Sequence, residues 1–182
     1  MLATTVSAEK ELDQIIHLSQ QNAKTAVSPE DKVSEGFISW TYTPELLHQL
    51  HKLQPGIIVK DGETLAGYAL VALKEAANFH KDLDAMICQL DQLPYGGKVL
   101  ADYRYYVMGQ ICIDKAFRGQ GIFDKLYAGH KEIYNQNYDC IVTEVATRNT
   151  RSLRAHQRVG FNTIHKHTDE TEDWEVMVWD WS

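Results

Sequence analysis

ICIDKAFRGQGIFDKLY, residues 111–127, joins a β-strand to an α-helix through a turn that contains two glycines. The first residues are β-branched and apolar, which favours a strand, and residues 122–127 carry apolar side chains at helical spacing. Gly119 and Gly121 lack a Cβ atom, so the backbone can curve tightly and come close to another group. Main-chain N–H groups at a helix start attract anions, and Arg118 would add a charged donor. The turn is therefore either a phosphate cradle or a tight turn without a ligand, and the four residues RGQG alone favour the latter.

Two other phosphate-binding motifs compete for this turn. A P-loop requires a lysine followed by serine or threonine after its last glycine, and the sequence has neither at those positions. A dinucleotide fingerprint matches at Gly119 and Gly121, and Glu144 stands where the ribose-binding acidic residue would be. Asp124, however, occupies the third glycine position. A nicotinamide-dependent enzyme therefore remains an alternative, supported by a partial motif only.

The pattern on either side of the turn predicts helices and strands in alternation. Thr43-Pro44 and Asn149 are helix-start signals, Ser7 is the expected N-cap of the first helix, and Asp61-Gly62 is a hairpin signal. The expected elements are helices after Ser7, from Pro44, over 75–93, from 122 and over 150–159, a hairpin over 56–74, and strands over about 103–113, 140–147, 161–167 and 174–181. This order predicts a mixed α/β (α+β) fold with a partly antiparallel sheet flanked by helices.

Length and composition indicate one soluble domain over residues 1–182. The chain is 44% apolar and 24% charged, with a net charge of −7, which argues against a broad nucleic-acid or anionic-membrane footprint. No segment is long and apolar enough to span a bilayer, and the N-terminus does not resemble a signal peptide. Cys88, Cys112 and Cys140 are widely spaced and form no metal-ligand pattern. We expect a cytoplasmic protein with free thiols and no metal.

Two motifs in the right order give the chain a family resemblance. The residues from Arg118 to Phe123 resemble the Q/R-x-x-G-x-G/A signature of the GCN5-related N-acetyltransferase (GNAT) superfamily. NTRSLRAHQRVGF, residues 149–161, is similar to the family's N-x-x-A-x-x-x-Y-x-x-x-G-F, with Ser152 at the small position and His156 in place of tyrosine. Phe123 replaces the last small residue of the first motif. The resemblance implies a GNAT fold with a long bulged central strand, and acetyl-CoA as the acyl donor.

The resemblance also implies which residues hold the cofactor. Pantetheine would pair with the backbone of Ile111, Cys112 and Ile113, and the substrate would enter where the strands splay beyond Gly109. The remaining cofactor residues would be Arg118, Gly119, Gln120, Gly121, Ile122, Phe123, Asn149, Ser152 and His156.

Acetyl transfer to an amine needs a base, an oxyanion donor and an acid for the leaving thiolate. The main-chain N–H of Cys112 is the candidate oxyanion donor, whereas its thiol is expected to be a packing group. His156 is the candidate acid. Many relatives have a glutamate in the long strand, but none lies between Asp102 and Asp114 here. Glu144 on the next strand is the candidate base, with Tyr106 or an ordered water as alternatives.

The acceptor is expected to be a primary amine of a small molecule or peptide. Tyr105, Tyr106 and Gln110 are the candidate substrate-binding residues, and residues 75–100 are a candidate part of the acceptor pocket. The rival interpretation is a non-catalytic acyl-CoA-binding or sensing protein, favoured by the missing strand glutamate. The tail WEVMVWDWS, residues 174–182, could pair an edge strand with a second copy to form a homodimer, or pack on the core.

Overall fold

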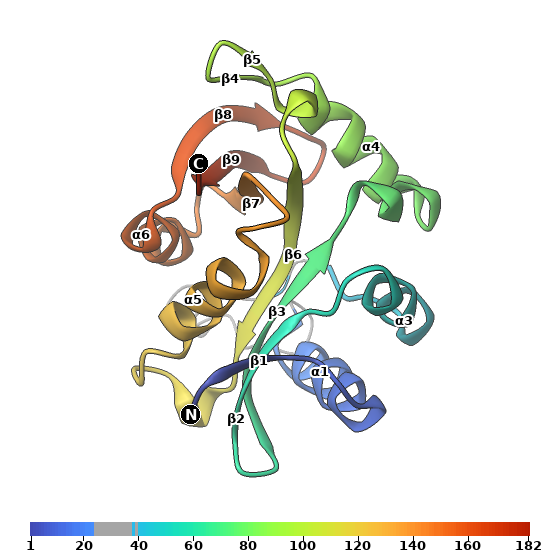
Figure 1. Cartoon of the computed structure of the whole chain (residues 1–182), viewed down its shortest axis with the longest axis vertical. Coiled ribbons are helices and arrows are strands. Elements are labelled where there is room, and N and C mark those ends of the chain that lie inside the picture. Colours follow the sequence, from blue (N-terminus) through green and yellow to red (C-terminus); the bar gives the residue numbers. More distant parts are fainter. Residues whose placement is uncertain (24–37, 39) are drawn as a thin grey trace. The chain divides into compact units, whose positions relative to one another are not determined.

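The computed structural model describes residues 1–23, 38 and 40–182, and the chain divides into two compact units. Unit 1 comprises Met1–Val71 and Gly109–Glu132, and unit 2 comprises Ala72–Met108 and Ile133–Ser182. The strands of the main sheet are hydrogen-bonded in the order β1-β2-β3-β6-β7-β9-β8 (Figure 1). Strand β6, Tyr105–Ile113, belongs to both units because the division falls at Gly109. This mixed α/β architecture confirms the expected fold class.

The described part of unit 1 contains the N-terminal half of the sheet and three α-helices. Its elements are β1 (Ala3–Thr5), α1 (Glu9–Gln21), α3 (Pro44–Leu53), β2 (Ile57–Asp61), β3 (Thr64–Ala72, of which residue 72 lies in unit 2), the second half of β6, the 3₁₀ turn η3 (Lys115–Phe117) and α5 (Ile122–Tyr134, whose last two residues lie in unit 2). Helices α1 and α3 pack together, and both ladders, β1 with β2 and β2 with β3, are antiparallel. The sequence indicated all of these elements except β1, which is only three residues long, and the 3₁₀ turn η3.

Local signals place most of the element ends in unit 1. The hydroxyl of Thr43 accepts a hydrogen bond from the Leu46 N–H at 3.2 Å, which confirms the predicted cap of α3. Gly62 has φ +58° in the β2–β3 turn, as the Asp-Gly signal predicts. The first helix differs from the prediction, because its N-cap residue is Ala8 and not Ser7. The carboxylate of Glu11 accepts the backbone N–H groups of both residues and so replaces a side-chain cap.

Unit 2 contains the C-terminal strands and the remaining helices. Its elements are the 3₁₀ turn η1 (Lys74–Asn78), α4 (Lys81–Asp91), β4 (Pro94–Tyr95), β5 (Lys98–Val99), the 3₁₀ turn η2 (Leu100–Asp102), the first half of β6, β7 (Cys140–Ala146), α6 (Thr150–Val159), β8 (Asn162–Thr168) and β9 (Asp173–Asp180). The predicted helix over 75–93 is therefore a 3₁₀ turn followed by a shorter α-helix. The small β4–β5 hairpin was not anticipated.

Strand β9 lies between β7 and β8 and pairs antiparallel with both (Figure 1). The tryptophan-rich tail is therefore an inner strand, and its edge is not available to a second copy. This corrects the interpretation of the tail as an edge strand, because the edge position is held by β8. Strand β6 pairs parallel with β7 over Tyr105–Val107, and this register ends just before Gly109.

Candidate active site

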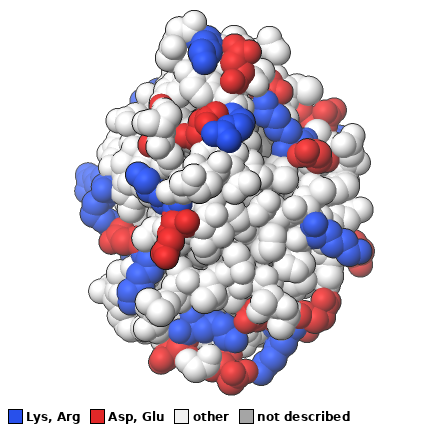
Figure 2. Space-filling view, in the orientation of Figure 1, with Lys and Arg blue, Asp and Glu red and all other residues white. Residues whose placement is uncertain are grey.

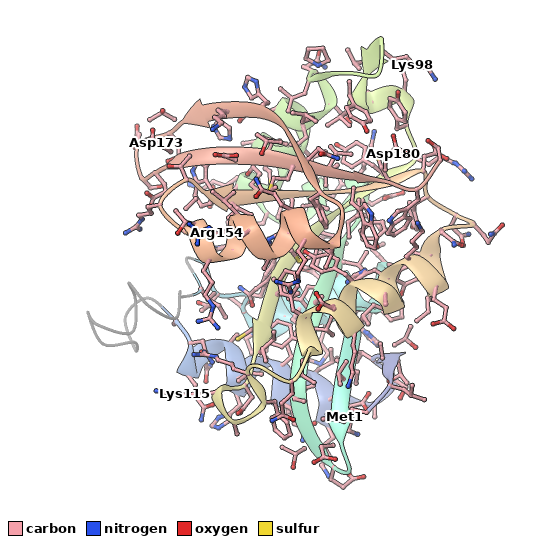
Figure 3. The ribbon with its side chains drawn as sticks, turned by 90° about the vertical axis from the view of Figure 1, so that its left-hand side faces the viewer. Met1, Lys98, Lys115, Arg154, Asp173 and Asp180 are labelled. Carbon is pink, nitrogen blue, oxygen red and sulfur yellow. The ribbon has the colours of Figure 1, made fainter. Side chains whose placement is uncertain are left out.

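The turn between β6 and α5 takes the conformation that its two glycines permit. The carboxylate of Asp114 accepts the Ala116 N–H at 2.8 Å and starts the short turn η3, where Lys115 is labelled in Figure 3. Gly119 and Gly121 then have φ angles of +76° and +72°, and α5 begins at Ile122. Both φ values are left-handed, a region that L side chains rarely adopt. The left-handed backbone therefore explains why both positions are glycine, whether or not a ligand binds at the turn.

Space beside the turn distinguishes it from a packed loop. A Cβ atom built on Gly119 or Gly121 would meet no atom of the described residues within 4 Å, apart from its own chain neighbours. At Gly67 of β3, by contrast, an added Cβ would lie 3.0 Å from the Cys112 carbonyl oxygen and 3.0 Å from Cγ2 of Ile122. The backbone of the turn is therefore open on the side where the glycines lack side chains, while Gly67 is required behind it for close packing. Sequence reasoning missed Gly67, whose only signal is a glycine inside a continuously apolar strand.

Two side chains of the turn have partners within unit 1. The Arg118 guanidinium donates to Oδ1 of Asn22, at the C-terminal end of α1, at 3.0 Å. This bond holds the side chain against the end of α1 and uses one of the five N–H donors of the guanidinium. Gln120 donates from Nε2 to the Ala116 carbonyl at 3.1 Å, which closes the turn on itself.

The end of β6 that leads into the turn is anchored in unit 1. The Asp114 N–H donates to the Ala66 carbonyl of β3 at 3.0 Å. Ile111, Cys112 and Ile113 precede it, and the Cys112 side chain is buried. Burial raises the pKa of the Cys112 thiol to about 12, so the thiol stays protonated at neutral pH. This state suits a packing group and opposes a nucleophile.

Gln110, one residue beyond Gly109, is held at both ends of its amide. Its Oε1 accepts from the Tyr68 hydroxyl at 2.6 Å, and its Nε2 donates to the Trp40 carbonyl at 2.6 Å. The amide is therefore oriented by two described neighbours. A role in binding substrate remains a prediction.

Tyr105 and Tyr106 are core residues of unit 2. The Tyr105 hydroxyl donates to Asp91 at 2.9 Å, and the ring is 3% exposed. Tyr106 is completely buried and packs edge-on against Tyr138, with ring centroids 4.8 Å apart. These contacts give the two rings a packing role. A role of either residue in binding substrate, and of Tyr106 as a base, stays a prediction.

The second motif forms helix α6 in unit 2, where Figure 3 labels Arg154. Oδ1 of Asn149 accepts the Ser152 N–H at 3.1 Å, so Asn149 is the predicted N-cap. Gly160 ends the helix with φ +116°, and a Cβ there would lie 2.5 Å from Nε1 of Trp179. Asn149, Ser152 and His156 follow one another along the helix, and the His156 side chain is buried against Phe161.

The contacts of His156 define its protonation. Nδ1 lies 2.8 Å from the Ser152 carbonyl oxygen, and because a carbonyl can only accept, Nδ1 carries the proton in the neutral ring. Nε2 is then an acceptor. Burial lowers the pKa of His156 to about 4, so the ring is neutral at physiological pH. The neutral ring can therefore take a proton at Nε2, and it can act there as an acid only after it has done so.

Glu144 on β7 has an interaction that sequence reasoning missed. Its Oε1 lies 3.1 Å from Nε2 of His167 on β8, and the two side chains are only 18% and 17% exposed. Burial raises the pKa of Glu144, and the hydrogen bond from His167 opposes this rise. The alternation His165-x-His167 indicates that the two histidines share one face of a strand, but it does not show that Glu144 is the partner of His167.

The described residues contain no helix long and apolar enough to cross a membrane. Among curated proteins, no sequence matches this chain. Solved structures with a similar fold include the NatC complex bound to Gag peptide and CoA (12% identity, TM-score 0.66, covering 100% of this chain and 98% of that one). They also include the ribosomal-protein-S18-alanine N-acetyltransferase from Escherichia coli (14%, 0.64, 99% and 93%). A GNAT-family acetyltransferase from Streptococcus agalactiae 2603 is similar too (18%, 0.64, 99% and 96%).

These likenesses are below 25% identity and establish the fold alone. The family itself is shown by a sequence model described as the acetyltransferase (GNAT) family, which matches residues 19–161. That range contains the glycine turn, Glu144 and the whole second motif. The chain therefore belongs to the acetyltransferase (GNAT) family.

Proposed function

We propose that the protein transfers an acetyl group from acetyl-CoA to a primary amine of a small molecule or peptide, directly and without an acetylated enzyme intermediate. The observation that carries the proposal is the open, left-handed turn at Gly119 and Gly121 at the start of α5, in a chain of the GNAT family. A helix start with close backbone access suits a diphosphate. When bound, acetyl-CoA supplies the thioester that the amine attacks.

The residues assigned to the cofactor follow the family motifs. The backbone of Ile111, Cys112 and Ile113 would hold the pantetheine arm. The diphosphate is assigned to Arg118, Gly119, Gln120, Gly121, Ile122 and Phe123, and the cofactor contacts from α6 to Asn149, Ser152 and His156. The open backbone at both glycines and the anchored Arg118 fit this assignment.

In the proposed reaction, the substrate nitrogen loses two protons, one before and one after it attacks the thioester. The ammonium form of the substrate gives its first proton to the carboxylate of Glu144, and the neutral amine then attacks. The main-chain N–H of Cys112 is assigned to the developing oxyanion. Attack leaves a second proton on nitrogen, which Nε2 of His156 accepts and passes to the leaving sulfur. The pKa of about 4 makes the resulting imidazolium a strong donor to a thiolate.

The partners and location follow from the same features. On the face in Figure 2, small groups of lysine and arginine are interspersed with aspartate and glutamate among uncharged residues, and no broad basic patch is visible on that face. The free thiols Cys88, Cys112 and Cys140 suit a reducing compartment, and we therefore propose a cytoplasmic location.

The test is a thiol-release assay with acetyl-CoA and a panel of primary amines that includes spermidine and short peptides with free α-amino groups. We expect turnover with at least one amine, and a loss of at least a hundredfold in Glu144→Gln or His156→Ala. The rival is a non-catalytic acyl-CoA sensor, which the missing glutamate in β6 favours. Thermal stabilisation by CoA without turnover on any amine would support the sensor and refute the enzyme.

A further inference from the structure

Three side chains from the C-terminal strands of unit 2 lie on one face of the sheet. Glu144 of β7 is directly opposite Val176 of β9, and Val176 is directly opposite His165 of β8. Directly opposed residues project to the same face, and so do residues two apart in one strand. His167 therefore shares this face with Glu144 and His165. Its imidazole reaches Glu144 across the intervening strand.

An irregularity in β8 brings the histidines to this face. The register with β9 shifts between Thr163, which pairs with Met177, and His165. Ile164 is the extra residue. If the pairing were regular, Ile164 would lie opposite Val176 and His165 opposite Glu175, so His165 and His167 would project to the opposite face. The bulge is thus the feature that allows His167 to reach Glu144.

The opposite face of the same strands has its own polar contacts. Thr163 donates to Glu175 at 2.7 Å, and Lys166 lies 2.7 Å from the same carboxylate. These contacts already tie β8 to β9, so the strand does not depend on His167 for its attachment. His167 and Glu144 differ from that cluster because both are largely buried, whereas the Lys166 side chain is 65% exposed.

The charges that face Glu144 come from β8 and the turn after it. Burial raises its pKa most strongly, the hydrogen bond and charge of His167 lower it, Asp169 raises it, and His165 lowers it. Asp169 is itself engaged, since it accepts hydrogen bonds from Thr171. His165 stacks on His167 with ring centroids 6.1 Å apart. His167 is therefore the principal group that opposes protonation of the buried carboxylate.

We propose that His167 is a positioning residue that orients the Glu144 carboxylate and keeps it ionised, so that it can accept the proton of the substrate ammonium. In the resting state Nε2–H of His167 donates to one carboxylate oxygen. The other oxygen takes one proton from the ammonium, which becomes the neutral amine, and that proton returns to solvent after acetyl transfer. This inference rests on the proposed function and extends it from Glu144 to its buried partner.

The experiment measures kcat/KM against pH with acetyl-CoA and the best amine from the panel. His167→Phe and His167→Val both remove the N–H donor. Two such variants are made so that the test still stands if one of them fails to fold. His167→Gln retains an N–H donor, and His165→Gln is the matched control on the same strand and face. We expect the acid limb of the profile to move about one pH unit higher in the Phe and Val variants. The Gln variants should stay within threefold of wild type.

A second measurement needs neither cofactor nor substrate. Carboxyl-¹³C NMR of labelled glutamate, assigned with Glu144→Gln, follows the titration of Glu144 in each variant. We expect its midpoint to rise in His167→Val and to stay close to wild type in His165→Gln. An active His167→Val enzyme with an unmoved acid limb and an unmoved Glu144 midpoint would show that the pair is only a structural contact, and would overturn the inference. A wild-type protein that neither binds CoA nor releases thiol would instead mark failure of the proposed function.

Discussion

Replacing Gly121 with alanine separates the folding role of the turn from its proposed role in binding. Gly121 has φ +72°, and an added Cβ would meet no atom within 4 Å in the part of the chain that the structure describes, so the expected cost of the substitution is left-handed strain. That strain is about 1–2 kcal/mol. Gly62 in the β2–β3 hairpin has φ +58° and equally open surroundings. Gly62→Ala is therefore a matched control with the same expected loss of stability.

The two variants should differ only when CoA is present. For a domain of this length, 1 kcal/mol corresponds to about 2–4 °C in Tm, so both variants should melt about 2–8 °C below wild type. CoA at a hundred times its Kd stabilises a protein by about 2.7 kcal/mol. A methyl group at the diphosphate surface should weaken binding at least tenfold, which is about 1.4 kcal/mol. Gly121→Ala should thus lose about half of the CoA-induced rise in Tm.

Thermal unfolding with and without CoA gives the result directly. Wild type and Gly62→Ala should show the same rise in Tm on addition of CoA, and Gly121→Ala a smaller one. Equal rises in the two glycine variants would show that the backbone at Gly121 does not contact the ligand, and would contradict the proposed diphosphate site.

Three further outcomes follow from buried groups. Burial lowers the pKa of His130 to about 3, so the unfolded chain binds an extra proton as the pH falls below about 6.5 and stability is lost. In urea titrations between about pH 6 and pH 4, His130→Gln should reduce the pH dependence of the unfolding free energy by about 1.4 kcal/mol per pH unit; an unchanged slope contradicts this. Because the Cys112 thiol stays protonated, mass spectrometry should find no acetyl adduct after incubation with acetyl-CoA alone, and Cys112→Ala should retain transfer within threefold. Tyr105→Phe loses the bond to Asp91 and, if the ring only packs, should lower stability by about 1 kcal/mol with unchanged kcat/KM; a large kinetic loss would instead support the predicted role of Tyr105 in binding the acceptor.

Signals that act within a few residues were sufficient to predict much of the fold. Thr43, Gly62 and Asn149 each satisfy or permit the backbone geometry of their own turn, so their roles follow from residue type. Strand β1 was not predicted because a strand of three residues is too short to show an alternation of apolar and polar side chains. The N-cap of α1 was misplaced because the Glu11 carboxylate, three residues into the helix, does the work expected of a cap.

Features that depend on strand register could not be predicted. The inner position of β9 follows from pairing on both of its edges, which an isolated apolar strand does not reveal. The approach of His167 to Glu144 depends on the shift at Ile164, and only the paired strands define that shift. The proton position on His156 depends on the contact of Nδ1 with the Ser152 carbonyl, one helical turn earlier. The sequence does not show this contact because it depends on the rotamer of the histidine side chain. The sequence therefore proposes a set of site residues, whose roles stay predictions, but it does not give their protonation states.

The most direct test of the central claim is a crystal structure of the protein with CoA. We expect diphosphate oxygens to lie within about 3.2 Å of main-chain nitrogens between Gly119 and Phe123. Diphosphate held instead by the arginine side chains of α6, with the glycine turn bare, would contradict it.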